Sequence, residues 1–192
     1  MPISPQNTGR PTATAAPPHE TLGSFTLPER SLIRAMRELA LQPTVCDSLI
    51  DQYTVLLGGN REDARTAVNG LGGLLRTLAT NPRRKMRFRP PACPVVAPDE
   101  RAVLALITAC QQKDRVWVRS IIGWLLTPAA QSLGALYAKE IATSFHDNGR
   151  TLTCIFPSPR KDIVSTPSLG KNTSIRLVRE KNQASVRLPT GP

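Results

Sequence analysis

The sequence predicts an all-α protein, a compact bundle of about six helices with disordered N- and C-terminal tails. Apolar residues recur at the spacing of an amphipathic helix through two blocks, roughly 27–80 and 98–146. Most of the 18 prolines lie in the first 28 residues, at positions 82–98 and in the C-terminal tail. Aromatic residues make up only 4% of the chain, which is low for a β domain built on aromatic and β-branched strands. A chain of 192 residues with 40% apolar content can form one domain with an ordinary core.

Proline and charge divide the chain into three parts. Residues 1–25 are rich in Pro, Thr and Ala and lack periodicity, so we expect a disordered tail there. Residues 26–146 form the expected helical domain, which a basic, Pro-rich linker at 81–97 interrupts. Residues 147–192 predict a basic, mostly flexible tail. The net charge of +11 favours an anionic partner, such as nucleic acid or an acidic membrane surface.

The first helix is expected to begin at Thr26, because Thr26 and Glu29 have the spacing of a capping box, and to end at Pro43. Three arginines lie at i, i+4 and i+7 on one side of it. Such a stripe could contact phosphates, but exposed helix charges usually do no more than face solvent, so we expect a solvated stripe. These arginines are Arg30, Arg34 and Arg37.

Two further helices are expected in the first block. Thr44 can cap the second helix, and Gly58-Gly59 ends it. Asn60 caps the third helix, which has the most regular apolar spacing in the chain. Three glycines interrupt this spacing without shifting its phase, and no phosphate-loop pattern surrounds them. We therefore expect them to permit close helix packing or a kink; they are Gly70, Gly72 and Gly73.

The second block has the same three-helix organisation. Residues 98–100 suit the first turn of a fourth helix, and Thr127-Pro128 predicts the start of a sixth. When the second block is aligned with the first at an offset of 71 residues, Glu29 falls on Glu100, and apolar residues of one block fall on apolar residues of the other, as Met36 does on Ile107. An internal duplication into two related three-helix blocks would explain this agreement, and so would chance, because two amphipathic helices in phase always agree in part.

The stretch 115–126 predicts a fifth helix that is apolar on almost all sides. Eight of the 11 residues from Val116 to Leu126 are large and apolar, and both tryptophans of the protein lie among them. We expect this helix at the centre of the bundle, or half-covered by another subunit. Its apolar faces make Trp117 and Trp124 the candidate interface residues.

The most suggestive polar stretch is RRKMRFR at 83–89, which has five positive charges in seven residues. Such a segment can follow a phosphate backbone while Phe88 stacks on a base. The alternative is a solvated linker, because a Pro-rich stretch follows it. In the C-terminal tail, basic residues alternate with apolar ones, as suits an arm that orders on a partner. The candidate nucleic-acid-binding residues are Arg83, Arg84, Lys85, Arg87, Phe88, Arg89, Arg176, Arg179, Lys181 and Arg187.

The sequence offers no pattern of catalytic or metal-binding residues. His19 and His146 are the only histidines, and the G-x-S-x-G and HExxH motifs are absent, so we expect a protein that is not an enzyme and has no cofactor. The four cysteines form no CxxC pair, which makes them a poor ligand set for zinc. Without an apolar run long enough to span a membrane, or a secretory signal, we expect a cytoplasmic protein with reduced thiols.

Two function hypotheses follow from these observations. The first is a small, basic, non-enzymatic helical protein that binds nucleic acid through flexible basic segments, in a regulatory or accessory role. The alternative is a protein–protein adaptor or assembly subunit, including a homo-oligomer, that uses the apolar helix faces around Trp117 and Trp124. No helix-turn-helix pattern can be located, so we name no recognition helix.

Overall fold

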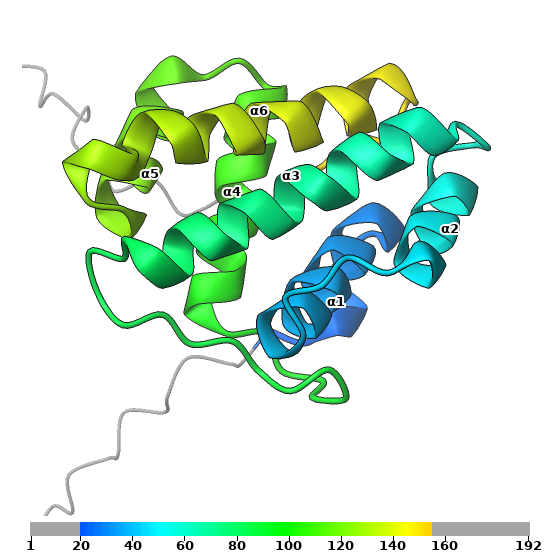
Figure 1. The fold of residues 1–192 in the computed structure, drawn as a ribbon, viewed down its shortest axis with the longest axis horizontal. Helices are drawn as coiled ribbons and strands as arrows, with labels where there is room; N and C mark the ends of the chain where they lie inside the picture. Colours follow the sequence, from blue (N-terminus) through cyan, green and yellow to red (C-terminus); the bar gives the residue numbers. More distant parts are fainter. Residues whose placement is uncertain (1–19, 155–192) are drawn as a thin grey trace, which may run out of the picture. The chain divides into compact units, whose positions relative to one another are not determined.

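Six α-helices make up most of residues 20–154, the part of the chain that this computed structural model describes (Figure 1). They are α1 (Leu27–Leu41), α2 (Asp47–Leu56), α3 (Arg61–Thr80), α4 (Pro98–Gln111), α5 (Arg115–Leu125) and α6 (Gln131–Asp147). Short 3-10 turns occupy Leu22–Ser24 and Pro128–Ala130, and no β-strand occurs among the described residues. The predicted all-α class is therefore confirmed. Most of the two predicted tails lies outside the described residues.

The helices α3 and α6 run antiparallel and in close contact (Figure 1). A Cβ atom on Gly70 would lie 3.2 Å from Ile141 Cγ1, and one on Gly73 would lie 2.6 Å from the Tyr137 ring. Glycine at these positions therefore lets the two helix backbones approach, because no side chain stands between them. The expectation of close helix packing is confirmed for Gly70 and Gly73 but not for Gly72, whose Cβ would meet only Val45, a residue outside the helices.

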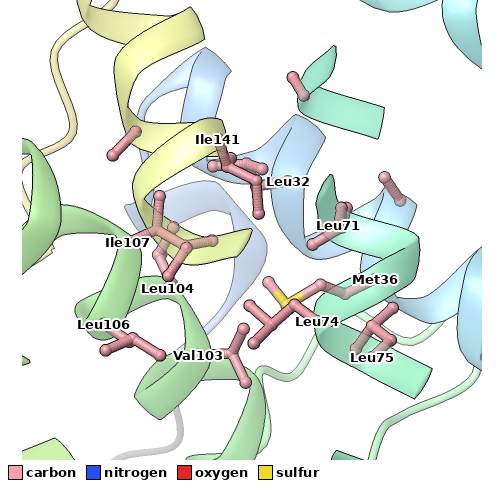
Figure 2. Packing of buried hydrophobic residues seen from close by; sticks show 14 of the residues in the cluster. Leu32, Met36, Leu71, Leu74, Leu75, Val103, Leu104, Leu106, Ile107 and Ile141 are labelled. Atoms are coloured by element: carbon pink, nitrogen blue, oxygen red, sulfur yellow. The ribbon is translucent and has the colours of Figure 1, made fainter. Parts of the chain in front are cut away.

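The hydrophobic core lies between α1, α3, α4 and α6 (Figure 2). Burial of such side chains supplies about 25 cal/mol for each Å² of apolar surface removed from water, so this core is the main source of stability. Residues labelled in Figure 2 come from all four helices: Leu32, Met36, Leu71, Leu74, Leu75, Val103, Leu104, Leu106, Ile107 and Ile141.

The helix that the sequence places at the centre of the bundle, α5, is only partly buried. Its buried residues are Ile121, Ile122 and Leu125, whereas Trp117 is half-buried and Trp124 is 44% exposed. The glycines of α3 bring α3 and α6 together, and α5 packs on α4 and α6 with one face. The predicted central placement is therefore wrong, because apolar content alone does not determine where a helix packs.

Packing onto the helices extends beyond the predicted domain limits of 26–146. Before α1, the Leu22 N–H donates to the Pro94 carbonyl at 2.8 Å. After α6, the Leu152 N–H donates to Gln111 Oε1 at 2.8 Å, and the Thr153 N–H donates to Glu29 Oε1 at 2.7 Å. The first residues of the predicted flexible C-terminal tail are thus held against α1 and α4 by hydrogen bonds.

Candidate nucleic-acid interface

The basic segment, residues 83–89, alternates in exposure along its length. Its residues at even positions, Arg84, Met86 and Phe88, are half-buried, and the two apolar ones pack against the core. Alternation of this kind is typical of an extended chain, in which successive side chains point to opposite sides. The four cations at odd positions are exposed and stand about 7 Å apart along the chain; they are Arg83, Lys85, Arg87 and Arg89.

Backbone hydrogen bonds hold the basic segment on the first turn of α4. The Arg87 N–H donates to Asp99 Oδ2 at 2.6 Å, and the Arg89 N–H donates to Glu100 Oε1 at 2.7 Å. The two carboxylates thus accept from backbone donors of the segment, and neither forms an ion pair with the side chains of Lys85, Arg87 or Arg89. The sequence indicated these acids only as favourable residues in a helix first turn.

Arg37 is fully buried and bridges α1 to the residues that follow the basic segment. Its Nε and Nη2 atoms donate to the two Glu100 carboxylate oxygens at 2.9 and 2.8 Å, and Nη2 also donates to the Val95 carbonyl at 2.8 Å. Its Nη1 atom donates to the Cys93 carbonyl. The predicted solvated stripe is therefore wrong at Arg37, although Arg34 is exposed as expected.

At its start, the basic segment is joined to the end of α5. Arg83 Nη1 donates to the Gly123 carbonyl at 2.7 Å. Arg84 forms an ion pair with Asp99, and its guanidinium lies 3.7 Å from the centroid of the Trp124 ring, a cation–π arrangement. Of the two candidate interface residues, Trp124 thus belongs to the same surface as the basic segment, whereas Trp117 packs half-buried against the core.

A hollow of about 820 Å³ lies between the basic segment and the start of α4. It is lined by residues 84–90, residues 97–99 and Trp124. Phe88, which we expected to stack on a base, is half-buried at its wall and packs against the core. Its ring is therefore less available for stacking than the sequence suggested. The chemistry that this surface offers is electrostatic: fixed, exposed cations beside an open hollow.

Among the described residues, Lys85, Arg87 and Arg89 form no ion pair, so their charges are available to an anion from outside the domain. The other four predicted nucleic-acid-binding residues lie outside the described residues; they are Arg176, Arg179, Lys181 and Arg187. Within residues 20–154 no group of three His, Cys, Asp or Glu side chains could hold a metal ion. None of the helices described is long and apolar enough to cross a membrane.

Comparison of the chain with protein-family models, with curated proteins and with solved structures finds no match.

Proposed function

We propose that the protein binds nucleic acid through the basic segment, as a non-enzymatic regulatory or accessory protein. One observation carries this proposal. The segment is fixed to the domain through its backbone and its even-numbered side chains, so three unpaired cations remain exposed along one edge: Lys85, Arg87 and Arg89. Fixing the segment before binding lowers the entropy that a flexible arm would lose on the partner.

Contacts of this kind reach phosphates rather than base edges. Phosphate contacts supply affinity and position the partner but carry no sequence information, so we expect binding with little sequence preference. The exposed cations repeat along an extended chain, which suits a partner whose charges also repeat along a line. On this proposal the basic residues beyond 154 add further phosphate contacts.

The test is the salt dependence of binding to a single-stranded DNA oligonucleotide. Each phosphate neutralised on a single strand contributes a slope of about −0.7 in log K against log salt. The triple variant Lys85→Gln/Arg87→Gln/Arg89→Gln should therefore bind more weakly, with a slope less steep by about 2. Arg84 is kept because it pairs with Asp99, and Arg83 is kept because it bonds to the Gly123 carbonyl.

A control variant removes the same net charge from elsewhere. Arg34, Arg61 and Arg65 are exposed on α1 and α3, and Arg61 and Arg65 pair with acids of α2 and α3. Changing all three to Gln should leave the salt slope close to that of the parent. Equal loss of slope in both triple variants would show that binding follows net charge and would contradict a specific role for the segment. Absence of binding by the parent at about 50 mM salt would contradict the proposal as a whole.

The adaptor hypothesis retains one observation in its favour. Large apolar side chains stay exposed on the last two helices, where a partner surface could cover them. A homo-oligomer of this kind would appear in light scattering, and Leu133→Gln/Leu136→Gln should then dissociate it without changing the salt slope. The exposed residues are Val116, Trp124, Leu133 and Leu136.

A further inference from the structure

A second basic surface, distinct from the basic segment, surrounds a hollow of about 590 Å³ between α5 and α6. We call it the α5–α6 hollow. Its volume falls within the range of small-molecule sites, about 300–1,000 Å³. Ten residues line it, and none of them is acidic: Cys110, Lys113, Arg115, Val118, Arg119, Ile122, Gln131, Ser132, Ala135 and Lys139.

The lining of the α5–α6 hollow differs between its two ends. The end of α5 packs against the start of α6, since a Cβ on Gly134 would lie 3.3 Å from Ile122 Cδ1 (Figure 1). Towards the other end, the lining residues come from the end of α4, the start of α5 and the middle of α6; they are Cys110, Lys113, Arg115 and Lys139. Three of the four cations therefore lie towards this second end, and Arg119 lies one turn further along α5.

Apolar side chains separate the cationic end from the polar residues near the start of α6. Val118 and Ala135 lie part-way along α5 and α6, and Ile122, Gln131 and Ser132 lie where the end of α5 meets the start of α6. A molecule seated in the hollow would therefore meet positive charge at one end and apolar surface along its length. A free inorganic anion would use only the first of these features.

The four cations of the hollow form no ion pair and no side-chain hydrogen bond with any described residue. Residues 1–19 and 155–192 together carry fewer acidic side chains than the hollow has cations. Residues 1–19 contain no acid, and residues 155–192 contain seven basic side chains against two acidic ones. In the free protein these exposed cations are hydrated, and an anionic ligand would replace part of that water.

We propose that the α5–α6 hollow binds a nucleotide-sized organic polyanion, with a di- or triphosphate group at the cationic end and a less polar body along α5. A single carboxylate would leave most of the positive charge unmatched, whereas a polyphosphate carries several negative charges within a short distance. The floor of Val118, Ile122 and Ala135 removes apolar surface of the body from water. This inference does not rest on nucleic-acid binding by the basic segment.

The first test titrates the full-length protein with ATP, without added metal, by calorimetry. We expect saturable binding with one ATP per chain. The triple variant Arg115→Gln/Arg119→Gln/Lys139→Gln should bind ATP at least about tenfold more weakly, because charge-assisted hydrogen bonds are lost. The control Arg34→Gln/Arg61→Gln/Arg65→Gln removes the same charge elsewhere and should bind ATP as the parent does.

The second test uses the Cys110 thiol as a reporter inside the hollow. ATP should slow alkylation of Cys110, because the bound molecule covers the thiol, and should leave the exposed Cys46 unaffected. Protection should disappear in the Arg115→Gln/Arg119→Gln/Lys139→Gln variant. Unchanged melting temperature and helix content would show that this variant is folded, as expected for three exposed side chains.

Several outcomes would overturn the inference. They are absence of saturable ATP binding, equal ATP affinity in the hollow variant, absence of Cys110 protection, and inorganic triphosphate binding as tightly as ATP. In the last case the hollow would recognise phosphate alone. If the hollow variant instead lost salt slope on single-stranded DNA while ATP did not bind, the hollow would be part of a nucleic-acid surface. The basic-segment proposal is tested independently, by the salt slope of the Lys85→Gln/Arg87→Gln/Arg89→Gln variant on single-stranded DNA.

Discussion

Glu100 joins three segments of the chain through hydrogen bonds to its two carboxylate oxygens. It accepts from the guanidinium of Arg37, from the Arg89 N–H and from the Ala97 N–H. Both side chains of the Arg37–Glu100 pair are fully buried. A buried charge is tolerated only when its partners satisfy it, so Arg37 keeps the Glu100 carboxylate in place at the end of the basic segment, where it accepts from the Arg89 N–H.

At the residue scale, the cysteines permit a prediction about reactivity. Cys46 is exposed at the N-cap of α2, and hydrogen bonds from Ser48 and from the Leu49 backbone lower the pKa of its thiol. Burial raises the pKa of Cys110 and of Cys154 to about 11. Because the thiolate is the reactive form, iodoacetamide should modify Cys46 first near neutral pH.

The pH dependence has a definite sign for each thiol. As pH rises, the alkylation rate of Cys46 should reach half its maximum below pH 9.0, the ordinary pKa of a thiol, whereas the rates of Cys110 and Cys154 should still rise towards about pH 11. Mass spectrometry of tryptic peptides after timed alkylation measures all three rates in one sample. Faster modification of Cys154 than of Cys46 at neutral pH would contradict the described burial.

At the scale of elements, the glycines of α3 are not equivalent. A Cβ on Gly72 would meet only Val45 Cγ2 at 3.5 Å, an ordinary van der Waals contact, whereas one on Gly73 would lie 2.6 Å from the Tyr137 ring. The sequence predicts that glycines in this helix serve close packing. It does not predict which of them faces the neighbouring helix, because the apolar spacing fixes a broad face and not one contact.

Substituting each glycine by alanine should therefore have opposite effects. Gly72→Ala should stabilise the protein by up to about 1 kcal/mol, since alanine has the higher helix propensity. Gly73→Ala should destabilise the protein. Overpacking against the Tyr137 ring costs about 1–3 kcal/mol, which exceeds the gain in helix propensity from alanine. Thermal unfolding measures both, with an expected separation of several degrees. Equal melting temperatures for the two variants would show that Tyr137 moves aside without cost.

The sequence predicts the helices of the fold better than it predicts the contacts of the basic segment. Caps, prolines and periodicity are local signals, and they locate the helices to within a few residues. The partners of the basic segment are not local: Asp99 lies 12 residues beyond Arg87, and Arg37 lies 63 residues before Glu100. A run of prolines and arginines therefore predicts a free linker, although its backbone is held by buried groups.

At the scale of the whole chain, the two three-helix blocks share more than helix order. Glu29 and Glu100, 71 residues apart, are both buried in the first turn of their helices. Each accepts from a segment that follows the third helix of the other block: Thr153 donates to Glu29, and Arg89 donates to Glu100. The segments before the two helices also pair antiparallel, at Thr21 and Val95. Internal duplication stays a prediction. It would explain why the two glutamates make equivalent contacts, each with the other block.

The Arg37–Glu100 pair should control both stability and the position of the basic segment. Arg37→Met would leave a buried carboxylate without its counter-charge and the Cys93 and Val95 carbonyls without their donor. Breaking such a pair typically costs about 3–5 kcal/mol. Arg34→Met, at an exposed position on the same helix, is the control and should change stability by less than about 0.5 kcal/mol.

Two measurements separate the consequences of Arg37→Met. Thermal unfolding should show a clearly lower melting temperature than in Arg34→Met. Below that temperature, trypsin should cut within residues 83–89 faster than in the parent, because the segment is no longer held against α1 and α4 and can open locally. If Arg37→Met melts like the parent and trypsin cuts at the parent rate, the pair does not position the segment. The exposed cations of the proposed nucleic-acid surface would then be held in place by the Asp99 contact and by the packing of Met86 and Phe88.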